Sequence, residues 1–373
     1  MNNRIAVIGA NEPLIPFYRR AKALGYEIVG IAWEDGAVCK KYCDRFYPVS
    51  FMEREKVLEI CRKERIAGIT SFSLESALPT VVYVARKLGL VSNTEESLAL
   101  TQSKYAQRQA LERAGIIVPR YYRIGDECGL ARVDCAFPVI VKPVDSGGSQ
   151  GICKVERPED LAGAFRSAVV FSRSRQVIVE EYIDGREFSV EYISHNGRHY
   201  FLQLTDKVTS GAPRFVEMQH HQPADVPAEL HLEIREMVEK ALTALKIENS
   251  PSHTEIKLNS RGELYIIETG ARMGGDHITS DLVRLSTGYD FVDGAIKLAL
   301  NQFTTPVLPL QMHSGVYFYS KLAPEVGDII LHHEKWPEIV EAEFYDKPLT
   351  EVKSNADRSG FFIYQSPDRR PVF

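Results

Sequence analysis

Short apolar segments alternate with amphipathic helical patterns over the first hundred residues, and this alternation limits the fold more than any other feature of the chain. Helical patterns such as 14–25 and 52–64 separate the predicted strands, which are 4–9, 26–33, 45–50 and 66–72. Parallel strands need such helical crossovers, so we expect a Rossmann-like parallel α/β domain over residues 1–108. Its first turn, GANEP, lacks the GxGxxG glycines, which argues against a nicotinamide cofactor.

The following region is rich in predicted strands, which are 138–142, 152–156, 176–183 and 187–193. A polar stretch, 205–227, interrupts them. So many residues with little periodicity more often form a functional loop or lid than a simple connection. A helix is predicted at 229–245, followed by a hairpin and two more helices. Residues 301–373 have mixed strand and turn character and carry no chemical motif that we recognise.

The bulk composition is typical of a soluble protein of two or three domains: 373 residues, 44% hydrophobic and 25% charged. A net charge of −5 offers no global attraction to nucleic acid or anionic membranes. No run approaches the roughly 18 apolar residues of a membrane span, and the amino terminus lacks a signal-peptide core. We therefore expect a cytoplasmic protein without nucleic-acid or membrane partners. Its six cysteines form no CxxC pair, which favours reduced thiols.

A glycine-rich segment, VIVKPVDSGGSQG at 139–151, joins two predicted strands. Glycines let backbone N–H groups approach a polyanion, so the loop is typical of a phosphate cradle. It is not a P-loop, because Lys142 precedes the glycines, and a strand rather than a helix follows Gly151. The segment therefore predicts a hairpin flap, with an ordinary mobile hairpin as the alternative.

The most informative chemistry lies in a second predicted hairpin at 253–272, HTEIKLNSRGELYIIETGAR. If its turn centres on Ser260 and Arg261, Glu255 lies opposite Ile266 and His253 opposite Glu268. Glu255 and Glu268 then become diagonal neighbours at about 7–8 Å on one face. Converging carboxylates repel unless a cation separates them, and Mg²⁺ is suited to two carboxylates and phosphate oxygens. The alternative is exposed edge charge, partly neutralised by Lys257.

The residues after Glu268 strengthen the metal interpretation. Arg272 would lie close to the metal, where its guanidinium can grip a phosphoryl group or a carboxylate. Gly274, Gly275 and Asp276 precede a predicted helix and would present backbone N–H groups to an anion. A simple helix-entry turn is the alternative.

Four features resemble, in their order along the chain, those of the ATP-grasp family. They are Lys142 before a glycine flap, the segment VEEYIDGREF, a TEIKL strand and an IIETGAR strand. The match covers roughly residues 1–300. It implies an ATP-grasp small subdomain at 109–190, a central subdomain at 191–300 and a C-terminal mixed α/β extension at 301–373. The family grips ATP between two α+β subdomains, and most members join a carboxylic acid to an amine through an acyl phosphate.

The resemblance implies a role for each matching residue. Two lysines, Lys104 and Lys142, would contact the phosphates, and the flap residues Ser146, Gly147, Gly148, Ser149 and Gly151 would cover them. The hinge strand, Glu180, Glu181, Tyr182 and Ile183, would bind adenine, and the Glu187 carboxylate would bind the ribose hydroxyls. Glu255 and Glu268 would bind Mg²⁺, with Mn²⁺ as an alternative, and Arg272 with Lys142 would stabilise the transferred phosphoryl group. Many members carry asparagine where this chain has Gly270, which leaves the number of metal ions open.

The polar stretch and the GGDH turn are expected to meet the substrate, through Lys207, Arg214, His220, Gly274, Gly275, Asp276 and His277. His220 and His221 could instead be a polar pair on a solvated turn, and a zinc site lacks a third ligand in sequence. We expect an ADP-forming carboxylate–amine ligase acting on small amino-acid-like carboxylate and amine substrates. A homodimer stays open. Alternatives are a bicarbonate-activating or carbamoyl-phosphate-type enzyme and a non-catalytic nucleotide-binding regulatory protein.

Overall fold

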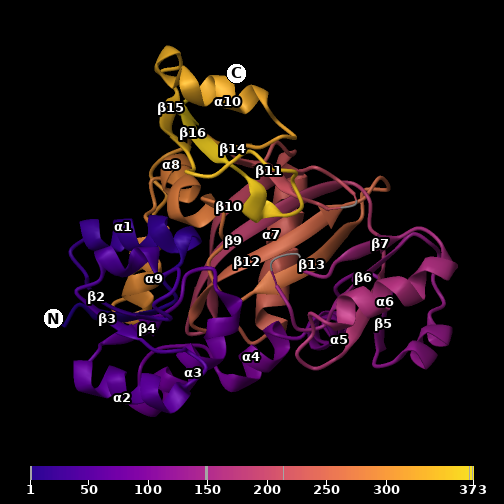
Figure 1. Cartoon of the computed structure of the whole chain (residues 1–373), viewed down its shortest axis with the longest axis horizontal. Helices are drawn as coiled ribbons and strands as arrows, with labels where there is room; N and C mark the ends of the chain where they lie inside the picture. The colour runs from indigo at the N-terminus through magenta and orange to yellow at the C-terminus, as the bar shows by residue number, and fades with distance from the viewer. Residues whose placement is uncertain (1, 148–149, 213, 369, 372) are drawn as a thin grey trace.

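The chain folds around three β-sheets (Figure 1). The computed structural model describes residues 2–147, 150–212, 214–368, 370–371 and 373. The N-terminal sheet lies to one side of a large central sheet and a smaller sheet lies to the other, with the C-terminal strands at the top of the view. Within the described residues, every helix is too short or too polar to cross a membrane.

The N-terminal domain is the predicted parallel sheet, with strand order β3-β2-β1-β4. Apolar side chains cover both faces, because helices pack on each side. Its strands are β1 Arg4–Ile8, β2 Glu27–Ala32, β3 Arg45–Pro48 and β4 Gly68–Thr70. Its helices are α1 Ile15–Ala23, α2 Arg54–Glu64, α3 Leu78–Leu88, α4 Glu95–Thr101 and α5 Lys104–Arg113. The α/β expectation for this part of the chain is confirmed.

The smaller sheet is antiparallel, with strand order β5-β8-β6-β7, and it packs on helix α6. The glycine segment joins β6 to β7, as the flap prediction requires. Lys142 lies on β6 and Glu180 on β8. The elements of this sheet are β5 Tyr121–Ile124, β6 Val139–Pro143, β7 Cys153–Val155, α6 Leu161–Val169 and β8 Val177–Glu181.

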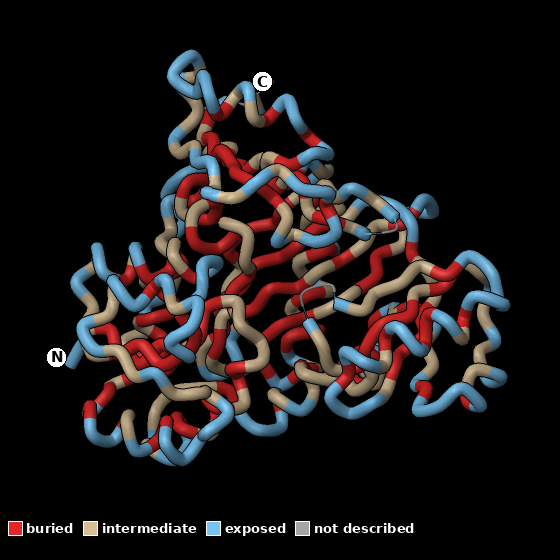
Figure 2. Tube along the Cα trace, viewed as in Figure 1, coloured by how far each residue is buried: buried red, intermediate tan, exposed pale blue. Residues whose placement is uncertain are grey.

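The large sheet has eight strands in the order β13-β12-β9-β10-β11-β14-β16-β15, all antiparallel. The C-terminal strands thus extend the same sheet that carries the β12–β13 hairpin, and buried residues concentrate along its strands (Figure 2). The strands are β9 Arg186–His195, β10 Arg198–Thr209, β11 Glu217–Gln222, β12 Ser250–Leu258, β13 Leu264–Gly270, β14 His313–Tyr319, β15 Ile339–Phe344 and β16 Gly360–Ser366. The helices are α7 Ala228–Ala244, α8 Val283–Thr287, α9 Phe291–Ala299 and α10 Glu325–Leu331.

The prediction of a long loop or lid at 205–227 was wrong. Residues 205–209 are the end of β10 and residues 217–222 form β11, and these two strands pair with each other inside the large sheet. Strand periodicity is hidden because the buried side chains here are polar and bond one another: the Gln222 amide donates to the Thr205 hydroxyl at 3.0 Å. His220 and His221 are therefore buried strand residues rather than a pair on a solvated turn.

Candidate active site

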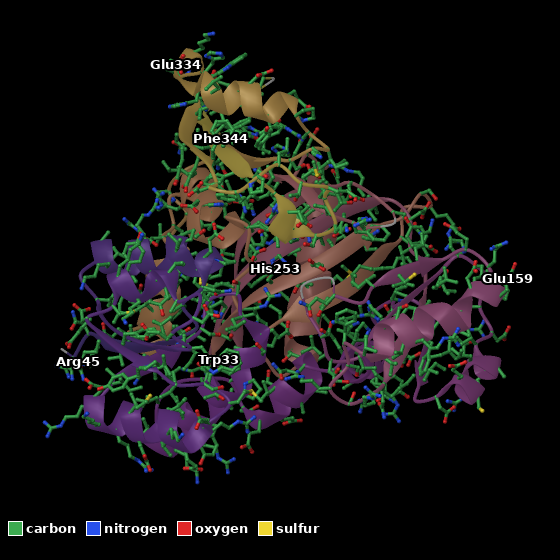
Figure 3. All side chains as sticks on the ribbon, viewed as in Figure 1. Trp33, Arg45, Glu159, His253, Glu334 and Phe344 are labelled. Carbon is green, nitrogen blue, oxygen red and sulfur yellow. The ribbon has the colours of Figure 1, made fainter. Side chains whose placement is uncertain are left out.

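A cavity of about 280 Å³ lies where the flap, helix α5 and the large sheet meet. Figure 3 labels one of its lining residues, His253, near the centre of the molecule on the large sheet. The N-terminal domain, the flap, the large sheet and the C-terminal region each contribute residues to this cavity. The polar lining residues include Ser73, Lys104, Lys142, Ser146, Glu217, His253, Glu255, Glu268, Arg272, Asp276 and Asn355. The structure thus brings together both predicted phosphate lysines, both predicted metal ligands and Arg272.

Glu255 on β12 lies directly opposite Glu268 on β13. The predicted register, with Glu255 opposite Ile266, was wrong for two reasons. The connection 259–263 has an odd number of residues, and the pairing shifts again between Glu255 and Ile256. Directly opposed carboxylates repel, and oxygen ligands in this arrangement fit a hard divalent cation. The donor set therefore fits the metal that the resemblance implies.

Ammonium groups partner both carboxylates. Lys104 Nζ lies 2.8 Å from Glu268 Oε1 and also donates to the Ser146 carbonyl at 2.7 Å. Lys207 Nζ lies 2.6 Å from Glu255 Oε1. Burial alone would raise the pKa of the Glu255 carboxyl, but Lys207 and His253 outweigh it and hold that pKa far below its usual range. Glu255 is thus kept ionised.

Lys142 is held by a buried ion-pair network behind the flap. Its Nζ lies 2.6 Å from Glu180 Oε2, while Arg108 Nε donates to Glu180 Oε1 at 2.6 Å. Burial lowers the pKa of Lys142. Burial alone would raise the pKa of Glu180, but the charges of Arg108 and Lys142 outweigh it and lower that pKa to about 2. The Glu180 side chain therefore anchors Lys142, which leaves only its backbone for the predicted adenine contact.

Lys207 occupies the middle of a group of carboxylates. Besides Glu255, its Nζ lies 2.8 Å from Glu217 and 3.3 Å from Glu187, the predicted ribose ligand. Burial alone would lower the pKa of the Lys207 ammonium, but these three carboxylates raise it well above its usual range. Lys207 was predicted as a substrate residue on a loop, whereas it lies on β10 between the predicted ribose and metal ligands.

The hinge and flap residues lie between the two antiparallel sheets. The Ile183 carbonyl accepts from Lys257 Nζ at 3.3 Å, and Lys257 and Lys154 both approach the Tyr182 ring. Glu181 Oε2 accepts from the backbone N–H of Arg120 at 3.4 Å. Gly147 lines the cavity, and Gly151 has φ +70°. Gly148 and Ser149 lie outside the described residues.

Two further acidic residues line the cavity besides the predicted metal ligands. Glu217 on β11 and Asp276 both accept from the Asn355 amide, at 3.3 Å each. Arg358 grips Asp276 with two bonds of 2.5 and 3.0 Å. Burial is the main cause of a raised Asp276 pKa, which Arg358 opposes. The 301–373 region, where no motif was recognised, thus supplies Asn355 and Arg358; no local sequence signal indicates either residue.

His220 lies beside this acidic pair. It is fully buried, and its Nε2 lies 3.4 Å from Glu217 Oε2. Ligand atoms of Glu217, His220 and Asp276 lie within 4.8 Å of one another, so Asp276 supplies the third group that the sequence lacked. Lys207 and Arg358 already neutralise the two carboxylates, which makes a metal ion unnecessary for their charge balance.

His253 was not predicted as a site residue, although it is the first residue of the hairpin motif. Its Nδ1 bonds to the buried Glu191 at 2.6 Å. Burial would lower the pKa of His253, but Glu191 and Glu255 raise it to about 9. A β-carbon on Gly274 would lie 2.6 Å from His253 Nδ1, so close packing against this imidazole requires glycine there. Gly275 and Asp276 line the cavity, and a π-helical turn, Ile278–Leu282, follows them.

Arg272 faces a carboxylate from the N-terminal domain. Its Nε lies 3.8 Å from Glu75 Oε2, and neither atom has a hydrogen-bond partner among the described residues. Burial raises the pKa of Glu75, and Arg272 opposes that shift. Glu75 also lies next to the flap, because a β-carbon on Gly147 would come within 3.5 Å of it. No sequence motif indicates Glu75, because only the packing of the N-terminal domain brings it close to Arg272 and Gly147.

Two predicted substrate residues are turned elsewhere. Arg214 is exposed and pairs with Glu351 at 3.3 Å. His277 bonds to Asp281 at 2.9 Å and packs on the Phe361 ring. Neither is among the described residues that line the cavity.

Comparisons with known proteins agree with this geometry. Residues 135–281 match the family described as "ATP-grasp domain". An uncharacterized protein of Sinorhizobium fredii is 26% identical over 82% of this chain and 65% of its own length. A D-alanine–D-alanine ligase of Geotalea uraniireducens is 28% identical over 47% of this chain and 57% of its own length. The chain thus spans about three-fifths of the length of these relatives.

A solved structure shows the same architecture over nearly the whole chain. The L-amino acid ligase of Bacillus licheniformis superimposes with a TM-score of 0.81 at 24% sequence identity. The superposition covers 98% of this chain and 93% of the ligase. Residues 135–281 are therefore an ATP-grasp domain, within a chain that has the fold of ATP-grasp proteins.

Proposed function

We propose that the chain is an ATP-dependent carboxylate–amine ligase that forms an amide or peptide bond between small, amino-acid-like substrates. The observation that carries this proposal is the direct opposition of Glu255 and Glu268 in a cavity that also holds Lys104, Lys142 and Arg272. The names of two relatives, a D-alanine–D-alanine ligase and an L-amino acid ligase, support amino acids as substrates.

The nucleotide would lie between the flap and the large sheet. In this arrangement Lys142 and Lys104 neutralise phosphate charge, Ser146 and Gly147 cover the phosphates, and the backbone of 180–183 meets adenine. Glu187, which lies 3.3 Å from Lys207 Nζ, would bond the ribose hydroxyls. Glu255 and Glu268 would hold Mg²⁺ or Mn²⁺, which supplies charge neutralisation to the phosphate oxygens when bound.

The protein's task in such a reaction is alignment and charge balance. A carboxylate is a poor acyl donor, and phosphorylation to an acyl phosphate gives it a good leaving group. Arg272 lines the cavity, so its guanidinium can stabilise negative charge on the transferred phosphoryl group. The neutral amine then attacks the acyl carbon, the bond from that carbon to the phosphate oxygen breaks, and the nitrogen gives up a proton to the leaving phosphate. ADP is the nucleotide product of the earlier phosphoryl transfer.

Two carboxylates of the cavity would offer oxygen acceptors to an amine substrate, although Lys207 and Arg358 balance their charge. They belong to Glu217 and Asp276, and the Asn355 amide bridges them. An ammonium group offers three donors to such acceptors. Asp276 and Gly275 would bind the substrate directly, while Gly274 is needed for packing against His253.

The experiment is a phosphate-release assay with Mg·ATP and a matrix of amino-acid pairs. The proposal expects phosphate release that depends on a productive pair, together with a product of the amide mass. Release with bicarbonate alone would instead support a bicarbonate-activating enzyme. Nucleotide binding without turnover for any pair or bicarbonate would favour a regulatory protein.

A further inference from the structure

We infer that helix α5 positions the proposed metal ligand Glu268. Gln107 and Arg108 of this helix bond to the backbone at the edge of strand β13, where a neighbouring strand would otherwise pair. This inference rests on the proposed function, because it concerns the same metal and nucleotide site. Neither residue lines the described cavity, so both are positioning residues rather than catalytic ones.

Strand β13 is the terminal strand of the large sheet, and among the described residues it pairs with β12 alone. The outward-facing backbone groups of an edge strand need other partners. Gln107 supplies them at Thr269: its amide accepts from the Thr269 N–H at 2.8 Å and donates to the Thr269 carbonyl at 2.9 Å. A primary amide offers one donor and one acceptor side, as a neighbouring strand would.

Arg108 provides the matching contact on the other side of Glu268. Its Nη2 donates to the Ile267 carbonyl at 2.6 Å. Ile267 is the residue left unpaired by the register shift that brings Glu268 opposite Glu255. The bulge frees this carbonyl from the ladder, and Arg108 captures it. Side chains of α5 therefore hold the backbone immediately before and immediately after the metal ligand.

The same guanidinium reaches the nucleotide side of the cavity. Arg108 Nε bonds to Glu180, which in turn holds Lys142. Lys104, Gln107 and Arg108 have the i, i+3, i+4 spacing of one helix face, and all three are buried. One face of α5 thus fixes the position of Glu268 relative to Lys142. In the proposed function the distance between these two residues determines whether one nucleotide can contact Lys142 and the metal ion on Glu268 together.

The test uses Gln107→Ala, which removes both bonds to Thr269 without touching a residue of the cavity. Mn²⁺ binding to the protein–ADP complex is measured by electron paramagnetic resonance. ADP binding in EDTA is measured by calorimetry, and folding by circular dichroism. We expect Mn²⁺ affinity to fall about 10-fold, the size of effect typical of groups that orient a metal ligand, while metal-free ADP affinity stays within about 2-fold. Arg113→Ala, at an exposed position of the same helix, should leave both affinities unchanged.

A folded Gln107→Ala variant with wild-type Mn²⁺ affinity would overturn the inference. If that variant does not fold, Arg108→Lys decides: it keeps a cation beside Glu180 but loses the second donor for Ile267, and it should show the same selective loss. Unchanged Mn²⁺ affinity in Arg108→Lys would then overturn the inference. Wild-type protein that binds neither ADP nor Mn²⁺ would instead refute the proposed function itself.

Discussion

Glu255 and Glu268 face each other directly across strands β12 and β13, and each carboxylate has its own ammonium partner. Lys207 pairs with Glu255, and Lys104 pairs with Glu268. Two opposed carboxylates on one face are unfavourable without positive charge between or beside them. The two lysines meet that need here, and in the proposed function a divalent cation would bind the same oxygens.

Replacing Glu268 with Gln should abolish ATP turnover but preserve nucleotide binding in EDTA. The amide keeps the shape of the side chain and removes the charge that a hard cation requires. Turnover is measured as phosphate release, and binding by calorimetry. Glu263→Gln, in the turn of the same hairpin and outside the described lining of the cavity, serves as the matched control and should keep wild-type turnover. Full activity in Glu268→Gln would remove the metal site from this hairpin.

Replacing Lys207 with Met should destabilise the protein by about 3–5 kcal/mol, since three carboxylates then lose their shared buried cation. Mg²⁺ should restore part of this loss, because a cation can replace the ammonium among the same oxygens. Urea unfolding with and without Mg²⁺ measures both effects. Equal Mg²⁺ stabilisation of variant and wild type would contradict the electrostatic account of Lys207.

Replacing Arg358 with Met should lower the unfolding free energy by about 3–5 kcal/mol. The Asp276 carboxylate then lies beside Glu217 without its buried cationic partner. The double variant Asp276→Asn, Arg358→Met should recover part of that loss, and the difference gives the coupling energy. Arg19→Met removes the exposed pair with Glu341 and should cost less than about 1 kcal/mol. Additive single effects would show that the Asp276–Arg358 pair is not coupled.

His221 should make the fold sensitive to acid. Burial, with Arg370 and His220 nearby, lowers its pKa from 6.5 to about 2, and its ring nitrogens bond to Tyr364 and Gln219 at 3.0 Å each. A depressed histidine pKa gives stability that is fully present above pH 6.5 and is lost as the pH falls toward 2, because the unfolded chain binds the proton first. The loss is at most about 1.4 kcal/mol per pH unit.

The measurement compares unfolding free energies of wild type and His221→Gln between pH 7 and pH 5. The difference between the two proteins should shrink as the pH falls, since glutamine carries no titrating proton. A constant difference over this range would show that His221 does not titrate on unfolding.

The sequence predicted the elements whose signals are local. Residues 4–72 alternate between apolar strands and helices, and the parallel sheet follows from that pattern. Lys142 and Gly147 were recognisable because the strand and the glycine loop adjoin in the chain. Glu255 and Glu268 were identified correctly as neighbours, although their register depends on a bulge whose freed carbonyl bonds to Arg108, more than a hundred residues away.

The rest of the site depends on distant packing. Arg358 meets Asp276 across 82 residues of chain, and Glu75 approaches Arg272 only when the N-terminal domain packs against the large sheet. Strands β10 and β11 were missed because buried polar residues, such as Thr205, Lys207 and Gln222, interrupt their apolar residues, so alternation of apolar residues could not reveal them. Periodicity reports which residues are apolar, and it says little where buried polar groups satisfy one another.

In the proposed reaction, ATP activates a carboxylate for attack by an amine. The most direct test begins with incubation of the protein with Mg·ATP and a productive amino-acid pair. The nucleotide products are separated by chromatography, and the mass of the amide product is measured by mass spectrometry. The proposed mechanism predicts one ADP and one phosphate for each amide formed. AMP and pyrophosphate in equal amounts with the product would contradict it.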